Sequence, residues 1–263
     1  MRRVSLVVVA VAVASLGGAR IAAAQLPNGI VRPTTEPAAP STQLGAELFA
    51  ANCASCHGID GSGISSPRPG ASDIEGLGPA LRGVGARAAD FYLRTGYMPL
   101  SSPHKEPSSG RVLFSEKEIE SLIAFVAALG KGPGIPHPDP AAGSIAQGLN
   151  AFTLHCAGCH QALARGGFVT GARVPPLQGV TATEIAEAVR IGPYLMPRFS
   201  TSQISNAELN SIIRYVLSTA HPDNAGGWGI GNLGPIPEGL VTWGIAAPLL
   251  IIGTLLVSRR ARR

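Results

Sequence analysis

Hydrophobic side chains recur with the spacing of an amphipathic helix in two parts of the chain. In both, apolar residues occupy positions i, i+3, i+4 and i+7, which places them on one helix face. Each run follows a capping box, in which a serine at the helix start pairs with a glutamate three residues later. The first run is Ile119, Leu122, Ile123 and Val126 behind Ser115 and Glu118, and the second is Leu209, Ile212, Ile213 and Val216 behind Ser205 and Glu208. The pattern predicts two equivalent helices, the first of which ends at Gly130.

The chain begins with a short apolar run behind two arginines. The residues from Val4 to Leu16 are uncharged and mostly apolar, and small residues follow at positions 22–24. This layout is typical of a secretory signal peptide, which we place at residues 1–24. The alternative is an uncleaved anchor, but the run is short for a membrane span and Arg20 interrupts its far end.

A longer apolar run lies near the other end of the chain. Residues 240–257 carry no charge over 18 positions, which is enough to cross a bilayer, and we expect a transmembrane helix at 239–258. Trp243 stands at one end, where an aromatic ring suits the membrane interface, and a basic tail at 259–263 follows the other. The positive-inside rule makes the tail cytoplasmic and the body of the chain extracytoplasmic. A buried core helix is the alternative, which the length and the arginines disfavour.

Composition agrees with a membrane-anchored chain. Charged residues make up only 14% of the 263 residues, below the ~25% typical of soluble domains. The formal net charge is +5, but seven of the 21 basic residues lie in the first 24 and the last five positions. The body then has 14 basic against 16 acidic residues, so no nucleic-acid-binding face is expected. The positive excess serves targeting and topology.

All four cysteines fall into one repeated motif. The two copies of C-x-x-C-H are Cys53, Cys56 and His57, and Cys156, Cys159 and His160. This motif is the attachment signature of c-type haem. Two thiols three residues apart lie on one side of a helical turn and can both bond the porphyrin edge, and the next residue presents an imidazole to the iron. The motifs therefore predict two covalent haems, with the two histidines as proximal ligands.

Disulfides, a redox dithiol and structural zinc are the alternative uses of these cysteines. An exported chain with an even number of cysteines first suggests disulfides. A redox pair requires no histidine directly after it, and here the histidine occurs twice. A zinc finger would separate each histidine further from its own cysteines. Haem attachment is the interpretation that uses every residue of both motifs.

One methionine is available as the second axial ligand of each iron. Apart from the initiator, the chain contains only Met98, 41 residues after His57, and Met196, 36 residues after His160. Each is followed by proline, which interrupts helices. A thioether opposite an imidazole raises the reduction potential, which suits electron transfer. Core packing is the alternative role of a lone methionine, and His104 is the one credible rival ligand.

The two motifs belong to a repeated unit. The matching residues are Gly45, Phe49 and Cys53 with Gly148, Phe152 and Cys156, and then Leu81, Gly83, Val84 and Gly96 with Leu177, Gly179, Val180 and Gly192. Short helices are predicted before each methionine, at residues 86–94 and 182–191. Each unit thus reads helix, C-x-x-C-H, loop, short helix, methionine loop and terminal helix. Units of about 80–90 residues have small cores, and a covalent haem supplies further apolar filling.

These elements predict an all-α fold with two tandem cytochrome c-like haem domains and a single C-terminal transmembrane helix. No nucleophile–base pair, phosphate loop or paired carboxylates indicate an independent catalytic site. After the signal peptide, the expected boundaries are a proline-rich linker at 25–41, domain one at 42–131, a linker at 132–142, domain two at 143–221, a membrane-entry loop at 222–238, the transmembrane helix at 239–258 and the basic tail at 259–263.

Four segments carry a resemblance to a known family. They are residues 78–85 (GPALRGVG), 90–99, 191–197 and 233–240. Over nearly all of residues 42–257, the chain resembles the dihaem cytochrome c subunit of the actinobacterial menaquinol–cytochrome c reductase, the cytochrome bc complex. The resemblance implies that His57 pairs with Met98 and His160 with Met196 as axial ligands. It also implies a Rieske iron–sulfur subunit as electron donor, a cytochrome b subunit as partner, and a terminal oxidase whose dicopper centre receives the electrons at the cell membrane.

Three functions fit two haem domains on a membrane anchor. The first is an electron-carrying subunit of a quinol-oxidising respiratory complex. The second is a membrane-tethered electron acceptor for an extracytoplasmic dehydrogenase, which the haem motifs alone leave open. The third is a dihaem peroxidase, which needs an open iron site and conflicts with two matched Met-Pro loops. The C-terminal anchor and the repeated Gly-Pro segments favour the first, and co-purification with a b-type cytochrome separates it from the second.

Overall fold

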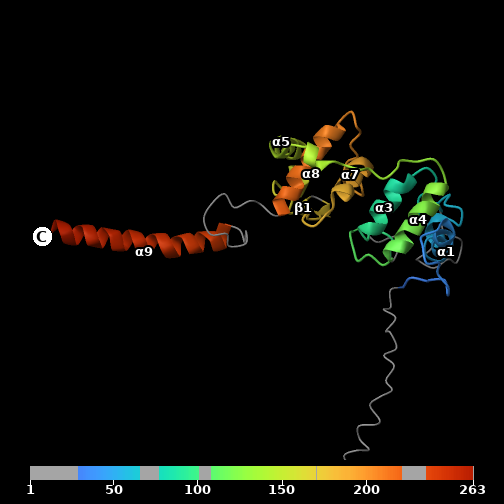
Figure 1. Ribbon diagram of the computed structural model, residues 1–263, viewed down its shortest axis with the longest axis horizontal. Helices are drawn as coiled ribbons and strands as arrows, with labels where there is room; N and C mark the ends of the chain where they lie inside the picture. The colour runs from blue at the N-terminus through green and yellow to red at the C-terminus, as the bar shows by residue number, and fades with distance from the viewer. Residues whose placement is uncertain (1–28, 66–76, 101–107, 170, 221–234, 263) are drawn as a thin grey trace, which may run out of the picture. The chain divides into compact units, whose positions relative to one another are not determined.

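The computed structural model describes residues 29–65, 77–100, 108–169, 171–220 and 235–262. The predicted signal peptide at 1–24 and His104 lie outside these residues. The chain divides into two compact units, Met1–Gly134 and Ile135–Arg263, and each is described by itself. In the part of the chain that the structure describes, both units are mostly helical (Figure 1).

The first unit is built around its terminal helix. Its described helices are α1 (Thr42–Asn52), α2 (Ala54–His57), α3 (Gly85–Arg94) and α4 (Glu116–Ala128). Both α1 and α3 pack against α4 (Figure 1). The apolar face predicted for α4 is buried at all four positions, and the predicted capping box at its start is present. The side chains that α1 adds to this core are Leu44, Leu48 and Phe49.

The second unit repeats this arrangement. Its described helices are the short 3₁₀-helix η1 (Pro140–Ala142), α5 (Ile145–His155), α6 (Ala157–His160), α7 (Ala182–Ile191) and α8 (Asn206–Ala220). Both α5 and α7 contact α8, and the apolar face predicted for α8 is buried. The short helices expected before the methionines are therefore confirmed as α3 and α7.

A glycine lets the first and last helices of each unit cross at close range. A Cβ added to Gly45 of α1 would lie 2.0 Å from the carbonyl oxygen of Ser121 in α4. At Gly148 of α5, the same atom would lie 2.0 Å from the carbonyl oxygen of Ser211 in α8. Only a residue without a side chain permits this approach, which explains why the repeat retains glycine at both positions.

A β-hairpin in the second unit departs from the all-helical expectation. Strand β1 (Gly167–Val169) pairs antiparallel with β2 (Ala172–Val174), and Phe168 lies opposite Arg173. Each strand has only three residues, too few for an alternating pattern to emerge from the sequence. The hairpin follows α6 directly along the chain, so it is a local addition to a helical domain.

The segment predicted as the first linker contacts α1 and α4. The backbone of Val31 and the side chain of Asn52 exchange two hydrogen bonds of 2.7 and 2.8 Å. Arg32 forms an ion pair with Glu118 at 2.6 Å, and Glu118 is almost completely buried. The amide of Ser41 donates to the hydroxyl of Ser121 at 3.1 Å. Residues 31–41 therefore belong to the fold of the first domain.

The second proline-rich segment is also tied to the domain that follows it. The amide of Asp139 donates to the side chain of Asn210 at 3.0 Å, and the amide of Ser144 donates to the hydroxyl of Ser211 at 3.1 Å. Arg214 donates to the carbonyls of Ala141 and Gly143 at 3.1 and 2.6 Å. The serine pair in this segment corresponds to the pair Ser41–Ser121 in the first domain.

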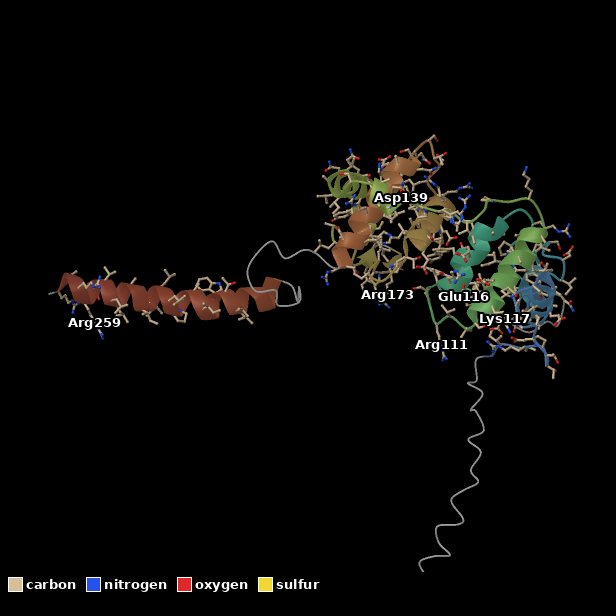
Figure 2. All side chains as sticks on the ribbon, in the orientation of Figure 1. Arg111, Glu116, Lys117, Asp139, Arg173 and Arg259 are labelled. Atoms are coloured by element: carbon tan, nitrogen blue, oxygen red, sulfur yellow. The ribbon has the colours of Figure 1, made fainter. Side chains whose placement is uncertain are left out.

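The chain ends in one long helix, α9 (Pro235–Ala261), with Arg259 near its C-terminal end (Figure 2). The stretch Gly239–Ala261 is long and apolar enough to cross a membrane, and its side chains are not covered by the rest of the chain. The helix begins at Pro235, four residues before the predicted span, because proline is well tolerated in the first turn of a helix. Residues 235–238 of the expected membrane-entry loop are therefore helical, and the rest of that loop lies outside the described residues.

Candidate haem sites

Each C-x-x-C-H motif forms a single helical turn behind a helix. At the end of α1, the amide of Cys53 closes the helix by donating to Phe49, and the amides of Cys56 and His57 then donate to the Cys53 carbonyl at 3.1 and 2.9 Å. In the second domain, the amides of Cys159 and His160 donate to the carbonyl of Cys156 at the same two distances. One turn therefore carries both sulfurs and the imidazole of each motif.

The imidazole of His57 is oriented by a backbone carbonyl. Its Nδ1 lies 2.8 Å from the carbonyl oxygen of Pro79, so a neutral ring with its proton on Nδ1 donates this hydrogen bond. The loop that carries Pro79 is held in turn, because the amide of Gly78 donates to the Cys56 carbonyl. The lone pair of Nε2 is left for a metal, as in histidines whose second nitrogen bonds a carbonyl.

The second domain also places a proline carbonyl near the ring of its motif histidine. The Nδ1 atom of His160 is buried and makes no hydrogen bond of good geometry, although the Pro175 carbonyl faces the ring. Burial lowers the pKa of His160, and the Pro175 carbonyl opposes that change. A neutral imidazole is the form that binds iron. Pro79 and Pro175 occupy equivalent repeat positions, so both domains place a carbonyl behind the proximal ring.

Burial has a strong effect on the first thiol of each motif. None of the four cysteines forms a disulfide. Burial, and to a smaller extent the neighbouring thiol, raises the pKa of Cys53 to about 12 and that of Cys156 to about 11. Reactive dithiols have lowered pKa values, because the thiolate is the nucleophile. Among the described residues, no group of three or more His, Cys, Asp or Glu side chains is arranged to hold a metal ion by itself.

An open cavity lies beside the loop that bonds His57. A cavity of about 320 Å³ is lined by residues 62–65 and 77–80. A Cβ on Gly63 would lie 2.6 Å from the amide nitrogen of Ala80, and one on Gly78 would lie 2.4 Å from the Cys56 carbonyl oxygen. Side chains at either glycine would therefore force the walls apart. The oriented imidazole and the two sulfurs on one turn fit a covalently bound haem.

Large apolar side chains near both motifs and beside the second methionine are exposed. In the first domain they are Ile59 at 68% and Leu77 at 46%, and in the second they are Leu154 at 78%, Leu163 at 56% and Leu195, which precedes Met196, at 59%. Exposed apolar surface of this kind suits contact with another apolar group. A porphyrin attached to the neighbouring cysteines is such a group.

Met98 lies in a loop that is fixed to α3. Its amide donates to the carbonyl of Tyr92 at 3.0 Å. The ring of Tyr97 lies 5.8 Å from that of Phe91 and 6.1 Å from that of Tyr92, measured between centroids. Gly96 has a left-handed φ of 68°, and a Cβ there would lie 2.3 Å from the Gly110 carbonyl oxygen. The loop thus leaves α3 through a turn that only glycine permits at this separation.

Met196 lies in the corresponding loop after α7. Gly192 ends α7 in the left-handed conformation, and the amide of Phe199 returns to the carbonyl of Val189 at 2.9 Å. The Met196 side chain packs against the hydrophobic core of the second domain. The sequence located both methionines but missed Pro79 and Pro175, whose recurrence at matching repeat positions was a usable signal.

Two helical domains, each with a C-x-x-C-H turn, define a c-type cytochrome with two haems. The family "Cytochrome c" matches residues 42–130, and the family "Cytochrome C oxidase, cbb3-type, subunit III" matches residues 143–216. The chain belongs to the family of cytochrome bc1 complex cytochrome c subunits. Relatives of that name occur in Mycobacterium tuberculosis H37Rv (33% identical, 90% of this chain and 84% of that one), Corynebacterium efficiens (32%, 82% and 76%) and Corynebacterium diphtheriae (29%, 99% and 96%).

These matches confirm several expectations from the sequence. The two cytochrome c domains, the two c-type haems and the family resemblance are all confirmed. An electron-transfer role and a membrane anchor at the C-terminal helix follow from the family and from the apolar helix Gly239–Ala261.

Proposed function

We propose that each haem of this chain is held by one motif and one methionine. Cys53 and Cys56 form thioether bonds to the first haem, and Cys156 and Cys159 form them to the second. The axial pairs are His57 with Met98 and His160 with Met196. The C-x-x-C-H turns, the carbonyl behind each proximal ring and the anchored methionine loops support this assignment.

The protein's own residues set the conditions for electron transfer. A bound haem iron cycles between its ferrous and ferric states. The carbonyl of Pro79 holds the His57 imidazole in the tautomer that leaves Nε2 available, and the Pro175 carbonyl faces the corresponding ring of His160. The neutral thioethers of Met98 and Met196 favour the reduced form and so raise the reduction potential. A histidine and a methionine together would occupy both open positions of each bound iron, which agrees with a role in carrying electrons.

The proposed route of the electrons runs from a quinol-oxidising complex to an oxidase. A Rieske iron–sulfur subunit, assembled with a cytochrome b subunit, reduces one haem, and the other passes electrons toward a terminal cytochrome c oxidase. The chain is then the electron-transfer subunit of a menaquinol–cytochrome c reductase. The single observation that carries this proposal is the family membership over most of the chain, anchor helix included.

The proposed orientation follows from the charge at the end of α9. Four arginines follow the apolar span, at positions 259, 260, 262 and 263. Such residues remain on the cytoplasmic side. Both haem domains, which precede the span, are then extracytoplasmic, where c-type haem attachment and a signal peptide are expected together.

Co-purification tests the route. The full chain, carrying an affinity tag after Arg263, is isolated in mild detergent from its native membranes. A pyridine haemochrome assay is expected to find two covalent haems in the chain, and spectra and mass spectrometry are expected to find a b-type cytochrome and an iron–sulfur protein. Recovery with a dehydrogenase and no b-type cytochrome would instead establish the tethered-acceptor function.

A further inference from the structure

The helix before each methionine loop carries an arginine at the same repeat position. Arg94 is the last residue of α3, and Arg190 is the next-to-last residue of α7. Met98 follows four residues after the first arginine, and Met196 follows six residues after the second. Both arginines reach the first residue of the terminal helix of their own domain.

Arg94 joins the end of α3 to the start of α4. Its two terminal nitrogens donate to both carboxylate oxygens of Glu116 at 2.6 Å each, and its Nε donates to Asp90 at 2.6 Å. Glu116 begins α4, where Figure 2 labels it beside Lys117. The pKa of Glu116 lies below its usual value because of the hydrogen bonds from Arg94.

This ion pair has a more definite geometry than an ordinary surface pair. Exposed single ion pairs contribute little, because water and salt screen them. Here Glu116 is 61% exposed, but the pair is bidentate, and the third acceptor, Asp90, is only 4% exposed. Fork-shaped pairs of this kind fix geometry as well as adding energy. Arg94 therefore locks the point from which the loop of Thr95–Met98 departs.

Arg190 holds the second loop directly. One terminal nitrogen donates to the carbonyls of Phe199 and Ser200 at 3.3 and 3.0 Å, and the other donates to the side chain of Asn206 at 2.9 Å. Phe199 follows Met196 by three residues. Asn206 begins α8, the position that Glu116 holds in α4. In each domain, the arginine therefore connects the end of the short helix to the first residue of the terminal helix.

We infer that Arg94 and Arg190 are positioning residues that hold Met98 and Met196 within reach of the haem irons. A thioether is a weak, neutral ligand, and its bond competes with water and with the freedom of its own loop. Fixing the loop in advance lowers the entropy that ligation must overcome. The inference rests on the proposed ligation by the two methionines. What the inference adds is that ligation by each methionine depends on an arginine that does not touch the iron.

Binding of carbon monoxide to the reduced, full-length protein in detergent tests the inference. A six-coordinate iron resists this ligand, and an iron that has lost methionine takes it up. Met98→Ala is expected to open one haem in each chain. Arg94→Gln is expected to speed carbon monoxide binding at that haem roughly tenfold, in line with the loss of a bidentate charged pair. Arg94→Lys, which keeps the charge but not the fork, is expected to restore part of the resistance.

A matched control separates loop positioning from general stability. Arg32→Gln removes another arginine–glutamate ion pair on the first turn of α4, to Glu118, but Arg32 comes from the N-terminal segment. It is expected to leave carbon monoxide binding and the far-red charge-transfer band of methionine-ligated ferric haem unchanged. Arg94→Gln is expected to weaken that band. Equal behaviour of the Arg32 and Arg94 variants would overturn the inference.

The second domain supplies an independent comparison. Arg190→Gln is compared with Arg214→Gln, which removes an arginine that binds two carbonyls of the preceding linker. Only the first is expected to open a haem. If Arg190→Gln lowers the number of haems bound per chain, Asn206→Ala takes its place in the comparison, because it removes only the hydrogen bond from Arg190 to Asn206.

The outcomes also separate the two proposals. If Met98→Ala leaves the first haem closed to carbon monoxide, the proposed ligation fails. If Met98→Ala opens the haem but Arg94→Gln does not, the ligation stands and only the role of Arg94 fails.

Discussion

Replacing Gly45 by alanine sets two physical effects against each other. Gly45 lies inside α1, where alanine is the better helix former by about 0.5–1 kcal/mol. Helix propensity alone therefore predicts a more stable protein. The added Cβ, however, would lie 2.0 Å from the carbonyl oxygen of Ser121 and 2.8 Å from the Cβ of Phe125. These short distances mean that packing predicts a less stable protein.

The distances decide which effect prevails. Ordinary contact with a carbon atom begins at about 3.4 Å, so α1 and α4 would have to separate by about 1 Å or more. The obstacle is a backbone oxygen inside a helix, which cannot rotate away as a side chain can. Overpacking of this kind costs about 1–3 kcal/mol, and separation also loosens the core of Leu44, Leu48 and Phe49. The net change is a loss of about 1–2 kcal/mol in the first domain.

Hydrogen exchange of the full-length holoprotein measures this loss domain by domain. Because two domains share one chain, a single unfolding midpoint is not a well-defined quantity. Amides in peptides from α1 and α4 are expected to exchange about tenfold faster in Gly45→Ala, while peptides from α5 and α8 serve as the internal reference. Gly148→Ala is expected to reverse the pattern, because its Cβ would lie 2.0 Å from Ser211.

Gly134→Ala is the matched control. Gly134 lies outside the helices, and no atom beyond its chain neighbours lies within 4 Å of the Cβ that alanine would add. This variant is expected to exchange at the normal rate or slightly more slowly. Slower exchange of α1 in Gly45→Ala would refute the packing argument, because it would show that the helices separate at negligible cost.

The remaining predictions concern pH, membrane topology and partners. Burial works to raise the pKa of Glu118, but hydrogen bonds from Arg32 and Ser115 outweigh it, so the pKa lies below its usual value. A carboxyl with a lowered folded-state pKa stabilises the protein above its unfolded pKa of about 4.5, and the benefit is lost as pH falls through the folded value. The stability difference between the normal chain and Glu118→Gln is therefore expected to be largest near neutral pH and to shrink below about pH 4.5; a constant difference would contradict this. Protease added outside intact spheroplasts is expected to digest both haem domains and to spare only the arginine tail, whereas protected haem domains would reverse the orientation. Residues 42–131 carry 8 basic and 9 acidic residues, and residues 143–221 carry 5 and 3, so neither domain has a large net charge to steer a diffusing partner. Quinol oxidation coupled to oxygen reduction is therefore expected to vary little with ionic strength and to need no soluble cytochrome c; a purified complex that consumes oxygen only with added cytochrome c would argue for a mobile carrier.

The helices and the core were predictable because their signals are local. The apolar faces of α4 and α8 and the capping box of Ser115 depend on spacing within a few residues, and all three occur in the structure. The C-x-x-C-H turns are similarly local. The methionine loops were located because methionine is so rare in this chain.

Contacts made by the backbone were not predictable in the same way. The carbonyl of Pro79 has no distinguishing side chain, and its distance to His57 depends on how a loop returns to α2. The ordered course of residues 31–41 depends on the buried carboxylate of Glu118, far along the chain, which binds Arg32. A proline-rich composition indicates an extended segment but does not indicate what the segment contacts.

The hydrogen bonds of the two proline-rich segments determine where this protein can be divided. A fragment that begins at Gly143 keeps all of α5 to α8 but loses the bond from Asp139 to Asn210 and one of the two acceptors of Arg214. A fragment that begins at Asp139 keeps them. By the same reasoning, an N-terminal fusion partner must end before Val31, because the Val31 amide donates to Asn52, the residue next to the first haem cysteine. The practical unit for expression, crystallisation or transplantation into another electron-transfer protein is therefore the domain together with its leading segment.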